Sequence, residues 1–155
     1  MNHSIPGKIT TPGLILALIL VALAIVLSNW TNDVQRAILD DDVKGLEKAL
    51  KDGGKPDVYV DNYRHAILWT AAHDKPDMTR LLIEHGADVN VTSRTLNSSV
   101  TPLHLAKSTQ VAKLLLDAGA SINAMDNQRK TVLDYALHVH KNKALVDFLK
   151  SNNAH

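Results

Sequence analysis

Three groups of residues in this chain have side chains that could support chemistry: eight histidines, a glycine–lysine turn and a run of aspartates. Histidines chelate zinc when they lie one helical turn apart, as in a His-Glu-x-x-His pattern. The sequence contains no such spacing, and His138 and His140 are two positions apart, on different sides of a helix. We therefore predict no metal site and no cofactor.

The other two groups have simpler structural explanations. Gly53-Gly54-Lys55 resembles the end of a phosphate-binding loop, but the upstream glycine and the following Ser or Thr are missing. Asp40-Asp41-Asp42 could act as paired carboxylates, yet acids before a helix also cap it and interact favourably with its dipole. The chain has no cysteine, which excludes a thiolate nucleophile, thiolate metal ligands and disulfides. We predict a non-enzymatic protein, and a hydrolase or metal-binding protein is the least favoured alternative.

The charge of the chain argues against one further class of function. The 155 residues include 17 Lys and Arg and 16 Asp and Glu, for a formal net charge of +1. Lys8 is the one charged residue among the first 28, so the remainder is formally neutral. A neutral surface lacks the basic footprint that nucleic-acid binding needs. We therefore expect no nucleic-acid partner.

An apolar run near the amino terminus divides the chain into three segments: residues 1–12, residues 13–30, which contain the run, and residues 31–155. Residues 14–27 are fourteen consecutive apolar residues, eleven of them Leu, Ile or Val. Insertion of these eleven side chains into a bilayer is favourable by about 3 to 7 kcal/mol. As a helix the run measures only about 21 Å, against a hydrocarbon core of about 30 Å, so a span would need its polar flanks. We predict a transmembrane anchor at residues 13–30.

A cleaved signal peptide is the alternative for the same segment, because Lys8 precedes the run and cleavage could follow Ala24 or Ser28. Lys8 lies before the run, whereas Asp33 and Asp40-Asp41-Asp42 follow it, and this position of the positive charge favours an amino terminus on the inside. The predicted location is a bacterial inner membrane, single-pass, with the rest of the chain in the periplasm. A periplasmic protein after cleavage and a cytosol-facing membrane scaffold are the alternatives.

The remainder of the chain repeats. Gly86-Ala87 and Gly119-Ala120 lie 33 residues apart, and each follows paired leucines and precedes a polar turn. Glycine at this place can adopt the left-handed conformation that ends a helix. The same step relates Leu82, Leu115 and Phe148, which we expect to form one buried ridge. A period of this length indicates stacked supersecondary units.

The segment Thr101-Pro102-Leu103-His104-Leu105-Ala106 is the clearest motif. Thr caps a helix, and Pro suits its first position because it has no N–H to leave unpaired there. Together with the period, this motif resembles the ankyrin repeat family, whose units consist of a β-turn finger and two antiparallel helices. The motif matches two other segments, Ala66-Ile67-Leu68-Trp69 and Thr131-Val132-Leu133-Asp134. In this alignment Trp69 and Asp134 stand where the motif has histidine. At Trp69 the local hydrogen bond that the histidine makes would be absent.

The resemblance covers residues 31–155 and implies an all-α repeat solenoid behind the amino-terminal hydrophobic helix. We expect about four units, at 32–60, 61–91, 92–124 and 125–152. The third unit carries extra residues in its finger, from Arg94 to Ser99, and a first helix that ends near Lys107. Insertions in repeat arrays usually map to one face, which is often the binding face.

The resemblance also implies a protein-binding function, because ankyrin proteins recognise partners through finger tips and the inner face of the first helices. We predict a protein partner. This chain would either inhibit that partner, as an immunity protein masks a toxin, or act as an adaptor that holds it. Tyr63 is the strongest single candidate, since an aromatic loop residue offers a large area at low entropic cost. The matching positions are Asn62, Tyr63, His65, His73, Asp74, Asn97, Ser98, Val100, Ser108, Asn127, Gln128, Lys130 and His138.

Overall fold

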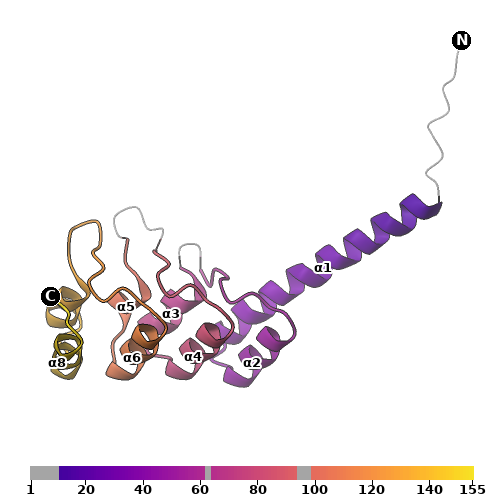
Figure 1. Cartoon of the computed structure of the whole chain (residues 1–155). Coiled ribbons are helices and arrows are strands. Elements are labelled where there is room, and N and C mark those ends of the chain that lie inside the picture. Colours follow the sequence, from indigo (N-terminus) through magenta and orange to yellow (C-terminus); the bar gives the residue numbers. More distant parts are fainter. Residues whose placement is uncertain (1–10, 62–63, 94–98) are drawn as a thin grey trace, which may run out of the picture.

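The computed structural model describes residues 11–61, 64–93 and 99–155, with the helical backbone alone described at residues 11–14 and 24–32. The helices stack into an elongated array from which the amino-terminal part of α1 projects (Figure 1). In the described residues there is no strand, and the fingers contain isolated bridges at Tyr59–His65 and Met125–Thr131. The helices are α1 (Thr11–Leu39), α2 (Val43–Lys51), α3 (Ala66–Ala72), α4 (Pro76–Glu84), α5 (Pro102–Leu105), α6 (Thr109–Asp117), α7 (Val132–Asp134), the π-helix η1 (Tyr135–Val139) and α8 (Lys143–Ser151).

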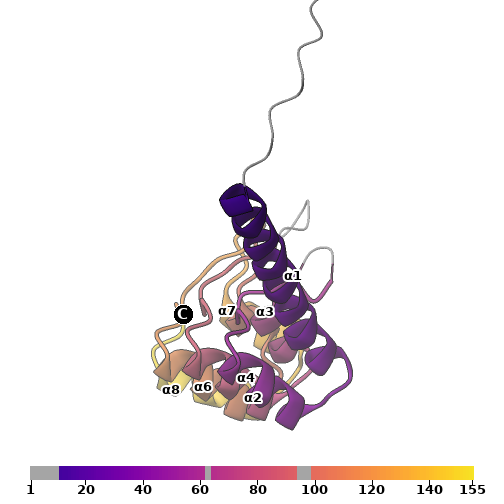
Figure 2. The ribbon, with the colours of Figure 1, turned by 90° about the vertical axis from the view of Figure 1, so that its right-hand side faces the viewer.

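Successive helices form two layers. The second helices α2, α4, α6 and α8 lie in one row, and the connecting loops project from the other side of the array (Figure 2). The first helices α3, α5 and α7 lie between that row and the loops (Figures 1 and 2). This arrangement confirms the predicted all-α repeat solenoid. It places the first helices and the loops on a common surface.

The ends of the second helices confirm the role predicted for glycine. Gly53, Gly86 and Gly119 follow α2, α4 and α6 with φ angles of 100°, 87° and 89°. Asn153 takes the same place after α8, with φ of 68°. The residue after each glycine donates its N–H back into the helix, as Ala87 does to the carbonyl of Leu82 at 2.9 Å. These hydrogen bonds satisfy helix carbonyls that would otherwise be unpaired.

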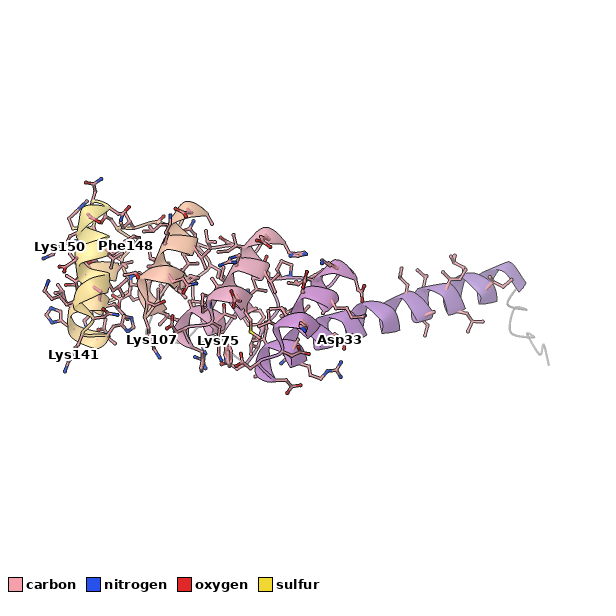
Figure 3. The ribbon with its side chains drawn as sticks, turned by 90° about the horizontal axis from the view of Figure 1, so that it is seen from below. Asp33, Lys75, Lys107, Lys141, Phe148 and Lys150 are labelled. Atoms are coloured by element: carbon pink, nitrogen blue, oxygen red, sulfur yellow. The ribbon has the colours of Figure 1, made fainter. Side chains whose placement is uncertain are left out.

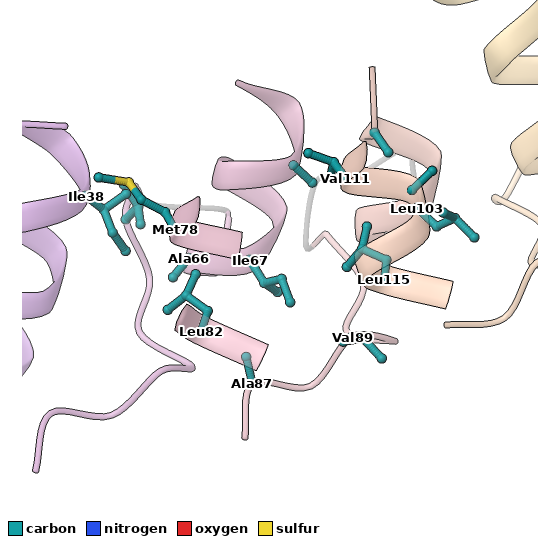
Figure 4. Close-up of a cluster of buried hydrophobic side chains, with 14 of the residues drawn as sticks. Ile38, Ala66, Ile67, Met78, Leu82, Ala87, Val89, Leu103, Val111 and Leu115 are labelled. Atoms are coloured by element: carbon teal, nitrogen blue, oxygen red, sulfur yellow. The ribbon is translucent and has the colours of Figure 1, made fainter. Parts of the chain in front are cut away.

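A continuous apolar core joins the two layers (Figure 4). Leu82 and Leu115 are completely buried, as predicted, but the third member of their ridge is Leu149. Phe148, the predicted member, is only partly buried. The reason is a change in the repeat interval. The residues that cap α4, α6 and α8 are Lys75, Ser108 and Asn142, so the interval between the last two caps is one residue longer than the interval before it. The π-helix η1 accommodates this extra residue, as π-turns inserted in helices do.

The predicted register of the second unit is also wrong by one residue. His65, Thr101 and Thr131 cap the three first helices, so Leu68 and not Trp69 matches the motif histidine. At the corresponding place in the fourth unit, Asp134 accepts hydrogen bonds from the N–H and hydroxyl of Thr131, at 2.8 and 3.1 Å. A carboxylate therefore replaces the histidine and retains the local hydrogen bonds.

Side chains spaced by the repeat period connect neighbouring loops. The Asp57 carboxylate accepts from the N–H of Asp88 at 3.1 Å, and the Asn90 side chain accepts from the N–H of Ser121 at 2.9 Å. Asn123 continues the series by accepting from the N–H of His155 at 3.0 Å. These bonds fix each loop relative to the next, and therefore fix the spacing of the fingers.

The prediction of a membrane anchor or signal segment at residues 13–30 is not supported. Helix α1 runs unbroken from Thr11 to Leu39, so residues 13–30 belong to the same helix as the start of the array. Within the part of the chain that the structure describes, no helix is long and apolar enough to cross a membrane. The predicted single-pass location is therefore unsupported.

Candidate protein-binding surface

Trp69, Leu105 and Tyr135 form a row along the first helices. Each is the fourth residue after its capping residue, and each is partly exposed. In α3 the other side is closed, because Ala66, Ile67, Leu68, Thr70 and Ala71 are buried. Because α3 packs against both α4 and α5, and α3 and α5 lie between the second helices and the loops (Figure 1), we infer that the exposed side of the first helices faces the loops. We call the row of Trp69, Leu105 and Tyr135 the inner row.

The first member of the inner row is held by a histidine. The rings of Trp69 and His73 stack with centroids 3.9 Å apart and an interplanar angle of 18°. The imidazole Nδ1 of His73 lies 2.8 Å from the carbonyl oxygen of Trp69. This contact orients the indole, which is partly buried against the core. A large, partly exposed aromatic surface is what protein interfaces favour.

The last member of the row is tied to the fourth finger. The hydroxyl of Tyr135 donates to the Asp126 carboxylate at 2.9 Å, and the N–H groups of Gln128 and Lys130 donate to the same carboxylate at 2.8 and 2.9 Å. Burial would raise the pKa of Asp126, but these hydrogen bonds outweigh it and lower the pKa. Burial and the Asp126 carboxylate raise the pKa of Tyr135 to about 12. The finger and the first helix are therefore one rigid unit at neutral pH.

His104 is structural and not a free chemical group. Its side chain is completely buried, and Nδ1 accepts from the N–H and hydroxyl of Thr101 at 3.2 and 2.9 Å. Burial lowers the pKa of His104, even though the carbonyl of Lys130 near Nε2 acts in the opposite direction. The His140 imidazole donates to the carbonyl of His104 at 2.8 Å. These contacts join the third unit to the fourth.

The structure places the predicted finger residues unequally. Asn127, Gln128 and Lys130 are exposed on the fourth finger, and His65 is partly exposed at the base of the second. Val100 is 7% exposed, because it lies in the base of the third finger, where its carbonyl accepts from Ser93. We therefore remove Val100 from the surface. The predicted residues Asn62, Tyr63, Asn97 and Ser98 lie outside the described residues.

Four other predicted residues lie away from the finger tips. His73 and Asp74 follow α3, Ser108 precedes α6, and His138 belongs to η1. Asp74 and Ser108 are hydrogen-bonded to each other at 2.5 Å, which connects the second unit to the third. His138 and His73 are exposed, so these two histidines extend the inner row toward the turns between helices. Sequence reasoning missed Leu105 and Tyr135, whose common spacing from the capping threonines was the available signal.

The acidic side chains described on this surface are engaged in local structure. Among the described residues, no group of three or more His, Asp or Glu side chains could hold a metal ion. The carboxylates of Asp126 and Asp134 are occupied by local hydrogen bonds. What the surface offers instead is aromatic area beside polar finger residues.

Comparison with known proteins agrees with this geometry. The family model for ankyrin repeats, in three copies, matches residues 68–155, and the chain therefore belongs to the ankyrin repeat family. Ankyrin repeats indicate a protein–protein interaction module, and proteins built from them are typically non-enzymatic adaptors.

Among curated proteins, the chain is similar to ankyrin repeat and SOCS box protein 6 of Homo sapiens, with 46% identity over 80 residues. The corresponding proteins of Mus musculus and Pongo abelii are each 44% identical over 80 residues. The match covers 48% of this chain but 18% of each relative, so the chain spans less than a fifth of the length of these relatives. These relatives are mammalian, and they give no support to the bacterial-type interpretation or to the periplasmic location inferred from it.

Proposed function

We propose that this chain binds one protein partner through the inner row and the exposed residues of the fingers. The observation that carries the proposal is the row of Trp69, Leu105 and Tyr135, which presents partly exposed side chains at the same place of successive first helices. Trp and Tyr are enriched among the residues that dominate binding free energy. Because the row is fixed by His73 and Asp126, little conformational entropy is lost when a partner binds it.

Site-specific photo-crosslinking in the full chain tests which surface the partner contacts. A photoreactive amino acid replaces Leu105 in the inner row or, as a matched control in the same unit, Lys113 on α6. Lys113 is exposed on the opposite layer and pairs with Asp117 at 2.8 Å. We expect a crosslinked partner from position 105 and none from position 113. Equal crosslinking at both positions, or crosslinking at 113 alone, would contradict the proposal.

The partner captured in this way allows the energetic test. Truncation of an interface hot spot costs at least about 2 kcal/mol of binding free energy. Trp69→Ala should therefore weaken binding about 30-fold or more in calorimetry. Glu84→Ala on α4 is the control, because Glu84 is exposed on the other layer. A melting curve of each variant separates lost affinity from lost fold.

The finer role that we propose is stoichiometric: the module either inhibits its partner or acts as an adaptor that holds it. A rigid array with no catalytic constellation acts on a partner only by occupying its surface. Titration of the partner's own activity with the full chain distinguishes the two roles. An inhibitor abolishes that activity at a one-to-one ratio, whereas an adaptor leaves it unchanged.

We also propose that the projecting part of α1 associates with a membrane, without crossing it. Seven large apolar side chains between Ile15 and Leu23 are 53 to 64% exposed, and they occupy all sides of the helix. An exposed apolar surface of this kind normally marks an interaction site. Flotation of the full chain with neutral lipid vesicles tests the proposal, with Ile19→Asp/Leu20→Asp as the variant. Failure of the unmodified chain to float would contradict it.

A further inference from the structure

The exposed cations of the array fall into two groups. Most of those on the second helices are paired with a carboxylate of the same helix, which neutralises them. The paired residues are Lys48, Lys51, Arg80, Lys113 and Lys143. The other group lies at the two ends of the first helices, and no member of it has an ion pair with another described residue: Lys107, Arg129, Lys130 and Lys141.

The fourth finger turns its acid inward and its cations outward. Asp126 is 7% exposed, and its carboxylate accepts from the hydroxyl of Tyr135 and from two backbone N–H groups. The next acid, Asp134, is engaged in the capping of α7. Arg129 and Lys130 are exposed at the finger tip, and we call them the finger pair. Because Asp126 joins this finger to Tyr135, the finger pair lies beside the inner row.

The turns at the other end of the first helices are also basic. Lys75, Lys107 and Lys141 follow α3, α5 and η1 and lie along one edge of the array (Figure 3). Lys75 is neutralised by Asp41 at 2.5 Å, whereas Lys107 and Lys141 have no such pair among the described residues. Asp74, the acid of this edge, is held by a hydrogen bond of 2.5 Å to the cap of α6. We call Lys107 and Lys141 the turn pair.

The surface between the finger pair and the turn pair is apolar. Leu105 and Tyr135 are partly exposed there, and Val139 is 58% exposed. The N–H of His140 donates to the carbonyl of Tyr135 at 2.8 Å, which is the i→i+5 bond of a π-helix. Val139 is therefore just short of one turn from Tyr135 and on the same side. The third and fourth units thus combine an apolar strip with cations along both edges.

We propose that the partner segment bound by the third and fourth units is acidic, with large apolar side chains at its centre. The apolar side chains contact Leu105, Tyr135 and Val139, and the carboxylates on either side face the finger pair and the turn pair. Opposite charges of this kind at the rim of an interface fix orientation and exclude wrong partners. Nucleic acid fits less well, because it needs a basic footprint that a chain of net charge +1 lacks. This inference rests on the proposed function, since it names the chemistry of the partner at the inner row.

A second copy of this chain offers one segment of similar composition, the turn from Leu39 to Val43. Both of these apolar residues are exposed, and three acids lie between them. Asp41 is already paired with Lys75 at 2.5 Å, and Asp42 accepts from the N–H that begins the capping of α2 at 2.9 Å. Two of the three carboxylates are therefore engaged within the chain itself, and a segment of another protein fits the two pairs of cations better.

Fluorescence anisotropy of the full chain with two labelled peptides tests the proposal. The first peptide has leucine and tryptophan at its centre and two glutamates on each side, and the second has glutamine in place of each glutamate. Since each exposed charge pair contributes little by itself, we expect the glutamate peptide to bind about fivefold tighter or more at low salt. This preference should disappear at high salt, because exposed charges are screened. Equal affinities at low salt would overturn the proposal.

Paired charge reversals locate the carboxylates. Arg129→Glu/Lys130→Glu and Lys107→Glu/Lys141→Glu should each reduce the preference for glutamate by at least about half. Lys113→Glu/Lys150→Glu is the matched control, because it changes the net charge equally at exposed residues of α6 and α8, and it should retain the preference. A thermal melt confirms that each variant is folded. A loss of preference in the control equal to that in the other two variants would overturn the proposal.

One further variant separates this proposal from the proposed function. Leu105→Ser should weaken both peptides alike, because it removes an apolar contact and no charge. Equal binding of the two peptides, both weakened by Leu105→Ser, would overturn the acidic segment and leave the inner row in place. A glutamate preference without any effect of Leu105→Ser would overturn the inner row as well. A concentration-dependent dimer in light scattering that Arg129→Glu/Lys130→Glu abolishes would also overturn the proposal, because the occupant would then be a second copy.

Discussion

The second helices of the array are uniform, and the first helices are not. Helices α2, α4, α6 and α8 are each 9 residues long, and a residue with positive φ lies two positions after the end of each. Helices α3, α5 and α7 have 7, 4 and 3 residues, and the last continues into the 5-residue π-helix η1. Both layers contribute buried side chains to one core, so the difference lies in the regularity of the helices. It indicates that the second helices maintain the stack, while the first helices and fingers are free to vary for recognition.

The largest expected effect tests this division within the third unit. Leu115 in α6 is completely buried, and Leu105 in α5 is only partly buried. Truncation of a buried leucine costs about 2 to 5 kcal/mol of unfolding free energy, because it removes contacts and leaves a cavity. Leu115→Ala should therefore lower the denaturant midpoint severely, and Leu105→Ala by less than half as much. Equal losses would show that the two layers contribute alike.

A medium effect concerns the capping of α7, the first helix of the fourth unit. The Thr131 hydroxyl accepts from the N–H of Asp134 at 3.3 Å. In return, the Asp134 carboxylate accepts hydrogen bonds from the N–H and the hydroxyl of Thr131. Thr131→Ala should lower the unfolding free energy by about 0.5 to 2 kcal/mol. Thr109→Ala, at the first position of α6 and not at its cap, should cost less in the same denaturant titration. A larger loss from Thr109→Ala would contradict the capping role.

The smallest expected effect is a dependence of stability on pH through His104. Burial lowers the pKa of His104 in the folded chain, whereas in the unfolded chain it titrates near 6.5. Below that pH the unfolded state binds more protons, so the unfolding free energy should fall as the pH falls, by at most about 1.4 kcal/mol per pH unit. His104→Gln should remove this slope, and His138→Gln, at an exposed residue, should retain it. An unchanged slope in His104→Gln would mean that another group is responsible.

Much of the fold follows from single residues in the sequence. Gly86 and Gly119 predict where the second helices end, and Thr101 predicts where a first helix begins, because each residue type has a strong local conformational reason to be there. Their positions in the structure match these expectations.

The error in the buried ridge arose because one residue is added to the repeat without any local signal in the sequence. The π-helix η1 shifts the buried ridge from Phe148 to Leu149, and a pattern of apolar residues does not distinguish these neighbours. The site was harder to predict, because it depends on which side of a short helix is covered. The bond between Tyr135 and Asp126 joins residues 9 apart whose proximity only the packing decides.

Hydrogen exchange of the full chain, with and without the partner captured at position 105, tests the central claim most directly. Binding at the inner row and fingers should slow exchange in α3, in α5 and η1, and in the fourth finger around Asn127 and Gln128. Exchange in the second helices α4 and α6 should change much less, because their exposed faces lie on the opposite layer. Protection confined to α4 and α6, with the first helices unchanged, would contradict the account.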